Sequence, residues 1–294
     1  YVHPEWAKAI GLQAAKTAVG SFTTPHRVNF LKTLASVTPK GLNRCQLYSS
    51  GAEAVEAALR LAKSKTGKFE VVGFWGGFHG KTQGVMGLLN DGFKNGYGAT
   101  APGLHLSPYP DSRNCPFGTK EEHDCGAHTL IFLREKLKRE TTGAVAAIII
   151  EPIQGTNGNV IPPAGFFKGV QSIAKEIGAV FISDEMITGF GRTGKMFGCD
   201  HEGVIPDMMT IGKGFGGGFP VSGVVTSREM AAAKPWSNPS GSSSSYGGNP
   251  LAAAACDTTL QIILRDKLAE NAATVGAAML RRLEQIQSKQ PLIG

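Results

Sequence analysis

Short apolar runs alternate with longer amphipathic segments along most of the 294 residues, and this order leaves few folds open. Residues 144–150 (AVAAIII) form a continuous apolar run, as in a strand that is covered on both faces. Residues 52–65 instead carry apolar positions at helical spacing. By the same criteria we expect strands at 44–48, 70–75, 179–183, 208–211 and 221–226, and helices at 127–139, 166–177 and, with breaks, 251–287. Strands that alternate with helices predict an α/β fold with a largely parallel sheet and helices on both faces.

The ends of the predicted strands carry the candidate reactive groups. Glu151 follows the run 144–150, Asp184 follows 179–183, and Lys213 follows 208–211. In parallel sheets ligands bind outside the carboxyl ends of the strands, so we expect all three side chains on that side. We expect Asp184 and Lys213 to be buried, and a desolvated lysine is a nucleophile that forms Schiff bases with carbonyl groups. A salt bridge explains Glu151 as well, and an N-cap or an ion pair with Arg192 explains Asp184 as well.

Two turns add a possible anion site and an aromatic surface. In SSGAEA (49–54), the small residues Ser50, Gly51 and Ala52 would let backbone N–H groups at a helix amino terminus approach an anion. An ordinary serine N-cap explains the same residues equally well. In WGGFHGKT (75–82), Phe78 could stack on a planar heterocycle with His79 beside it, although each residue alone is more often structural.

Known phosphate motifs do not account for Lys213. Gly214 rather than Ser or Thr follows the lysine, and Asp207 stands at the first glycine position of a P-loop. Residues 214–218 lack the GxGxxG spacing and a downstream acid for ribose. We therefore expect the glycines near Lys213 to let the backbone and a flat ring approach each other. Residues 76–117 are rich in Gly, Pro, Asn and Asp and are expected to form a long functional loop, whereas 237–245 suits a linker or an ordered loop.

Composition narrows the class of protein. The net charge is +7, yet no run of Lys and Arg exceeds two residues, which favours anionic small molecules or a basic surface over nucleic acid. No apolar run approaches the ~18 residues of a membrane span, and the first residues do not show a signal-peptide pattern. The odd, scattered cysteines predict reduced thiols in a cytoplasmic protein; they are Cys45, Cys115, Cys125, Cys199 and Cys256. Residues 115–128 hold two Cys and two His without the usual ligand spacing, so no metal site is expected.

Six segments together resemble the class III aminotransferases, the ω-type subgroup II of the fold type I pyridoxal-phosphate enzymes. In family order they are SSGAEA, GGFHGKT, EPIQG, DEMITGFGRTG, PDMMTIGKGFGGGFP and YGGNPLAAAA. One such motif is weak, but six in order are specific, and the resemblance runs from near His3 to the end of the chain. It implies the fold type I large domain, with a mostly parallel sheet of the seven-stranded type.

The resemblance implies pyridoxal 5'-phosphate as cofactor and assigns residues to it. Lys213 matches the lysine that holds the cofactor as a Schiff base, and Asp184 matches the partner of the pyridine nitrogen. Phe78 matches the aromatic residue that stacks on the ring, with His79 beside it. Met186 falls where a side chain packs on the other face of the ring.

Further matches concern the phosphate and the substrate. Residues 50–52 match the phosphate-binding turn. Ser245 stands where the family often has a threonine that reaches the phosphate of the neighbouring subunit, which implies a homodimer. Glu151 matches a glutamate near the substrate. Ile187 replaces a glutamine that bonds the ring oxygen in some relatives, so we do not expect that contact from this position.

The activity implied by the resemblance is transfer of an amino group from an amine or ω-amino acid to a 2-oxo acid. A decarboxylase, epimerase or aminomutase of the same fold is the alternative, and a binding protein without activity is a third. The expected organisation is an amino-terminal segment at 1–40, a cofactor-binding large domain at 41–275, and at 276–294 the start of a small carboxy-terminal domain that is truncated.

Overall fold

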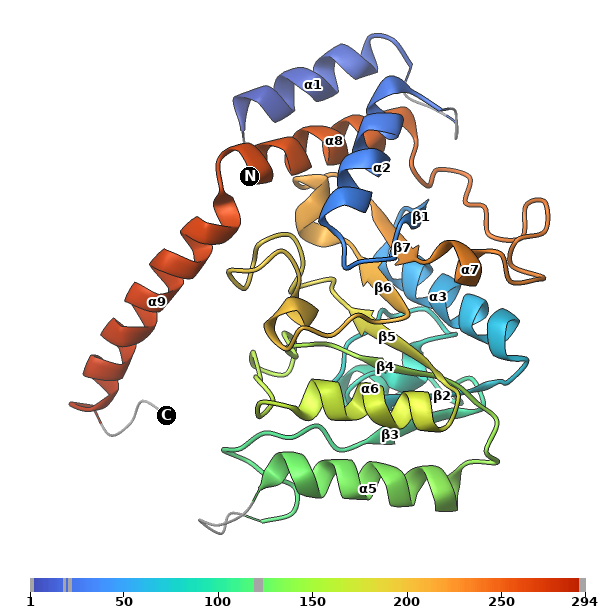
Figure 1. Cartoon of the computed structure of the whole chain (residues 1–294), viewed down its shortest axis with the longest axis vertical. Helices are drawn as coiled ribbons and strands as arrows, with labels where there is room; N and C mark the ends of the chain where they lie inside the picture. Colours follow the sequence, from blue (N-terminus) through green and yellow to red (C-terminus); the bar gives the residue numbers. More distant parts are fainter. Residues whose placement is uncertain (1–2, 18–19, 21–22, 119–123, 291–294) are drawn as a thin grey trace.

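The computed structural model describes residues 3–17, 20, 23–118 and 124–290, and in this part of the chain seven strands form one sheet (Figure 1). The order across the sheet is β1-β7-β6-β5-β4-β2-β3. The strands are β1 Arg44–Tyr48, β2 Glu70–Phe74, β3 Leu104–Ser107, β4 Val145–Ile150, β5 Val180–Asp184, β6 Met208–Ile211 and β7 Ser222–Thr226. Only β7 runs against its neighbours, pairing antiparallel with β1 and β6. The predicted α/β fold with a mostly parallel sheet is therefore confirmed.

The predicted helices are present, and the chain holds others that the pattern did not predict. The helices are α1 Pro4–Ala14, α2 Pro25–Val37, α3 Gly51–Thr66, α4 Asp91–Lys94, α5 Cys125–Glu140, α6 Phe166–Glu176, α7 Arg228–Ala231, α8 Pro250–Arg265 and α9 Leu268–Gln287, with 3₁₀ turns at Met86–Leu88, Gly198–His201 and Lys213–Gly216. The break expected within 251–287 lies between α8 and α9. None of the described helices is long and apolar enough to cross a membrane.

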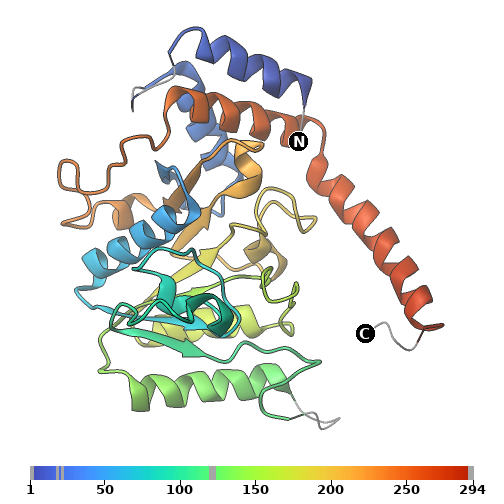
Figure 2. The same ribbon diagram turned by 180° about the vertical axis from the view of Figure 1, so that it is seen from behind.

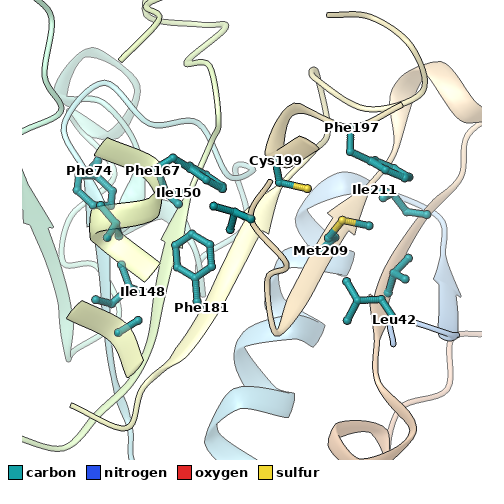
Figure 3. Packing of buried hydrophobic residues seen from close by; sticks show 14 of the residues in the cluster. Leu42, Phe74, Ile148, Ile150, Phe167, Phe181, Phe197, Cys199, Met209 and Ile211 are labelled. Carbon is teal, nitrogen blue, oxygen red and sulfur yellow. The ribbon is translucent and has the colours of Figure 1, made fainter. Parts of the chain in front are cut away.

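Helices cover both faces of the sheet. Successive strand residues point to opposite sides, and in the central strands the residues on both sides are apolar. Ile148 and Ile150 of β4 join a core cluster with side chains of α2, α5, α6 and α8. Ile149 between them joins a second cluster, which holds the apolar face of α3. Figure 3 shows part of the first cluster, where Phe181 of β5 lies near Ile148. Burial on both faces explains why these strands read as unbroken apolar runs.

The expectation of one irregular loop at residues 76–117 is wrong, because β3 lies within it. β3 pairs in parallel with β2 at the edge of the sheet. Its four residues, Leu-His-Leu-Ser, are mostly half-buried, so they carry neither a continuous apolar run nor a long alternation. A short edge strand of this kind leaves little signal in a sequence.

Two of the five cysteines also depart from expectation. Cys115 and Cys125 form a disulfide with their Cα atoms 5.9 Å apart, so the prediction of reduced thiols is wrong for this pair. The chain turns back after β3 and brings Cys115 to the first residue of α5, a proximity that spacing alone does not reveal. Cys45, Cys199 and Cys256 are free. Residues 119–123, inside the segment weighed as a metal site, lie outside the described residues.

Helix α9 contacts the fold through its first turns, where Ala269 and Ala273 lie against Gly191 and Gly194, and then extends away from it. Figures 1 and 2 show it reaching away from the sheet, and none of its described residues is buried. Its apolar side chains are open, Met279 at 60% exposure and Leu283 at 54%. The predicted domain boundary at residue 275 falls inside this helix.

Candidate active site

Five strands deliver the predicted site residues to one edge of the sheet. Ser50 follows β1, and the turn with Phe78 and His79 follows β2. Glu151 follows β4, Asp184 ends β5, and Lys213 follows β6. These strands point the same way, so their carboxyl ends meet on one side, as the sequence predicted.

Asp184 and His79 form the most buried part of this edge. His79 Nδ1 lies 2.7 Å from Asp184 Oδ2, and each side chain is 1% exposed. The other oxygen, Oδ1, accepts the backbone N–H of Met186 at 3.1 Å. Burial lowers the pKa of His79, but the hydrogen bond and the charge of Asp184 outweigh it, so the pKa is raised above its usual value. The partner of Asp184 is thus His79, in place of the alternative ion pair with Arg192.

Glu151 links two turns through its carboxylate. Oε1 accepts the N–H of Phe78 at 2.8 Å, and Oε2 accepts the N–H of Gly155 at 3.4 Å. Burial raises the pKa of Glu151 to about 7, and the charge of Asp184 acts in the same direction, while His79 and the two N–H groups oppose it. Backbone donors satisfy Glu151 here, in place of the salt bridge that was its simplest explanation.

The amino end of α3 lies directly against the turn after β2. Ser50 is the N-cap, and its Oγ accepts the N–H of Glu53 at 3.3 Å. The first N–H groups of a helix, here those of Gly51 and Ala52, have no partner within the helix. Gly80 has a left-handed backbone, and a Cβ there would lie 2.5 Å from that of Ala52. Glycine therefore lets the turn that carries His79 contact the start of α3.

Lys213 is exposed, so the expectation of a buried amine is wrong. It stands between Gly212 and Gly214, neither of which has a side chain to cover it. Its φ of +48° is uncommon for a residue with a side chain, and such strain clusters at functional sites. Lys213 lines a cavity of about 540 Å³ together with Met186 and Arg192, and no described residue of the lining is a carboxylate.

Met186 joins the lysine turn to the start of α3. Its side chain is 8% exposed, and its sulfur would lie 3.4 Å from a Cβ on Gly51. A Cβ on Gly212 would overlap the same sulfur. Ile187, the next residue, also lines the cavity and packs on Gly155. The structure thus brings together all of the predicted residues except Ser245.

Ser245 lies apart, on an exposed stretch of the loop that precedes α8. This loop is ordered, because Tyr48 Oη donates to the carbonyl of Ser242 at 3.0 Å and Gly248 packs on Leu47. The linker interpretation of 237–245 is therefore wrong. Within one chain, Ser245 has no described contact with the other predicted residues.

The sequence did not single out Glu185, which is fully buried beside Asp184. Its carboxylate accepts hydrogen bonds from the hydroxyls of Ser183 and Thr188 and from the N–H groups of Gly198 and Cys199. These bonds attach the segment 185–199, which borders the cavity, to the end of β5. The signal was an acid at a strand end with hydroxyl residues two and three positions away.

The family profile described as Aminotransferase class-III matches residues 1–294. The chain belongs to the class III aminotransferases. A diaminobutyrate–2-oxoglutarate aminotransferase of Rhizobium meliloti (strain 1021) is 35% identical over 280 residues, which cover 92% of this chain and 58% of the relative. The chain thus spans little more than half the length of that class III relative.

Solved structures of ω-transaminases share the fold. The (S)-enantioselective ω-transaminase of Thermomicrobium roseum is 30% identical with a TM-score of 0.89, and the match covers 98% of this chain and 67% of that one. The taurine:2-oxoglutarate aminotransferase of Bifidobacterium kashiwanohense, solved with PLP and glutamate, is 28% identical with a TM-score of 0.90, covering 98% and 66%. The expected class III resemblance and the fold type I sheet are therefore confirmed.

Proposed function

We propose that this class III family member is a pyridoxal-phosphate-dependent aminotransferase. The observation that carries the proposal is the buried Asp184–His79 pair at the same sheet edge as Lys213 and the amino end of α3. A buried carboxylate that is oriented by a histidine suits a protonated ring nitrogen. A helix amino terminus suits a phosphate, and a lysine suits an aldehyde.

The residues present fit this cofactor. Asp184 would accept the pyridine N–H, residues 50–52 would bind the phosphate, and Phe78 and Met186 would flank the ring. Lys213 Nζ would form the covalent link. When bound, the cofactor supplies an electron sink that stabilises negative charge on the carbon of the amino donor.

Each of these side chains has a defined task in the proposed reaction. Lys213 Nζ would hold the cofactor and, when free, would take the proton that leaves the carbon of the amino donor. Its exposure to the cavity leaves room for that movement. His79 orients Asp184 through the hydrogen bond between them, and Glu151 fixes the backbone of Phe78.

The substrates we propose are an amine or ω-amino acid as donor and a 2-oxo acid as acceptor. The diaminobutyrate and taurine relatives both carry 2-oxoglutarate in their names. The cavity beside Lys213 supports an acidic acceptor, because its described lining includes Lys213 and Arg192 and no carboxylate.

We also propose a homodimer in which Ser245 serves the phosphate site of the neighbouring subunit. Its exposed position on an ordered loop leaves it free to do so.

We also propose that the chain divides into an amino-terminal segment at 1–40, a large domain at 41–275 and the start of a small domain at 276–294, with the last boundary inside α9. A cytoplasmic location is supported by the three free cysteines and opposed by the Cys115–Cys125 disulfide, and mass spectrometry of the thiols from alkylated cells tests it.

The experiment that tests the activity combines a spectrum with a transfer assay. The purified chain is mixed with pyridoxal phosphate, and the lysine-bound absorbance band is followed across a panel of amines. Loss of the band on adding ω-amino acids, and its return with 2-oxoglutarate, is the expected result. Release of gas or racemisation without transfer would favour a decarboxylase or epimerase, and a chain that stays colourless would contradict the proposal.

A further inference from the structure

Phe78, the proposed ring-stacking residue, belongs to a cluster whose other members have no role in the proposed reaction. The cluster consists of Phe78, Lys81 and Phe93. Phe93 lies on the short helix α4 and is 36% exposed, Lys81 is exposed, and Phe78 is half-buried. The cluster is thus at the surface, where burial alone does not hold a ring in one orientation.

The backbone around Phe78 is fixed on both sides. Its own N–H donates to Glu151 at 2.8 Å, and the next residue, His79, is bonded to Asp184 at 2.7 Å. The N–H of Asn90 donates to the carbonyl of Gly77 at 3.1 Å, which attaches the segment leading to Phe93 to the same turn. These bonds place the Cα of Phe78, but they do not choose the rotamer of its ring.

The ring itself is held by the other two members. Phe93 meets Phe78 edge to face, with centroids 5.5 Å apart and planes at 81°. Lys81 Nζ lies 5.7 Å from the centroid of Phe78 and 5.0 Å from that of Phe93. A cation over an aromatic face is attracted by the quadrupole of the ring, and perpendicular aromatic pairs are favoured for the same reason. One ammonium therefore bridges two rings that already contact each other.

We propose that Lys81 and Phe93 are positioning residues that hold the ring of Phe78 in the orientation that flanks the cofactor. The proposal rests on the proposed function, since it needs a planar ligand beside Phe78. Neither residue has to touch that ligand. Because the cation and the second ring occupy part of the surface of Phe78, they restrict its rotation before the cofactor arrives, and preorganisation of this kind strengthens binding.

Four variants of the chain separate the effect of the charge of Lys81 from the effect of its position beside the two rings. Lys81→Met removes the cation and keeps the length of the side chain, and Lys81→Arg keeps a cation that can stack. Phe93→Leu removes the second ring. Lys63→Met, on the exposed side of α3, removes the same charge away from the cluster and serves as the control.

The first measurement is the affinity for pyridoxal phosphate and the induced circular dichroism of its absorbance band. We expect Lys81→Met and Phe93→Leu to weaken binding about five- to tenfold and to reduce the induced signal. Lys81→Arg and Lys63→Met should resemble the parent chain. Equal binding by Lys81→Met and the parent would overturn the proposal, and so would an equal loss in Lys81→Arg and Lys81→Met.

A second measurement needs no cofactor and separates the two proposals. In the cofactor-free chain, the stabilities of Lys81→Met, Phe78→Leu and the double variant form a cycle. Coupling between them is expected, and additivity contradicts the positioning role even if the cofactor binds. Coupling in a chain that binds no pyridoxal phosphate would instead contradict the proposed function while the contact between Lys81 and Phe78 stands.

Discussion

The two halves of the site differ in how deeply their side chains are buried. On the Asp184 side, the carboxylate and its histidine are 1% exposed, and Glu185 beside them accepts four hydrogen bonds. On the other side, Lys213 is exposed and lines a cavity. The first half is built like a protein core and the second like a binding surface. A substitution on the first side should therefore change stability, whereas one on the second side should change activity alone.

Lys213→Ala gives the largest expected effect. We expect transfer to fall by roughly a thousandfold or more, because the amine both holds the cofactor and moves the proton. The free energy of unfolding by urea without cofactor should stay within about 0.5 kcal/mol of the parent, since Lys213 is exposed. Lys195→Ala, another exposed lysine, is the matched control. A large loss of stability in Lys213→Ala would break the contrast.

Asp184→Asn tests the opposite side. The asparagine keeps the shape but leaves a buried histidine without its anion, and breaking a buried pair costs about 3–5 kcal/mol. We expect both the free energy of unfolding and the cofactor affinity to fall. Asp200→Asn, on a nearby half-buried aspartate, serves as a comparison. If Asp184→Asn unfolds at the parent's denaturant concentration, the pair does not stabilise the fold as argued.

Glu151 makes the buried side dependent on pH. Its pKa of about 7 in the folded chain lies above the unfolded value, so the folded state binds the extra proton. Stability from this group is therefore fully present below about pH 4.5 and is lost as the pH rises through 7, by at most about 1.4 kcal/mol per pH unit. Denaturation at a series of pH values checks this, and Glu151→Gln should flatten the slope, whereas the exposed Glu140→Gln should not. A slope unchanged in Glu151→Gln would assign the pH dependence to other groups.

The same contrast explains what the sequence could predict. Strand ends are readable, because unbroken apolar runs stop at Glu151, Asp184 and Lys213, and parallel order then places them together. The exposure of Lys213 was not readable, since it depends on the glycines beside it and on which segments cover the turn. The His79–Asp184 bond joins residues 105 positions apart, and only the packing of the turn after β2 creates it.

Other failures share this cause. The four residues of β3 gain their strand conformation from pairing with β2, not from their own pattern. The disulfide depends on the path of the chain between Cys115 and α5. Glu185 was passed over because Asp184 already accounted for the acid at this strand end, although the four donors to Glu185 come from residues on both sides of the following turn. Contacts between distant segments decide each case.

Ser50→Ala is the smallest change and lies on the boundary between the two halves. Ser50 is exposed, yet its Oγ caps α3 by accepting the N–H of Glu53. Loss of an N-cap costs about 1 kcal/mol, so we expect a modest fall in stability. Because the hydroxyl also stands at the proposed phosphate turn, the cofactor affinity should fall as well, by about fivefold to tenfold.

Ser50→Thr keeps the hydroxyl and should restore both the stability and the cofactor affinity. Ser227→Ala removes the N-cap of α7, away from this edge, and should lower stability alone. If Ser50→Ala behaves like Ser227→Ala, the residue is only a cap, and the phosphate turn has to rely on backbone N–H groups.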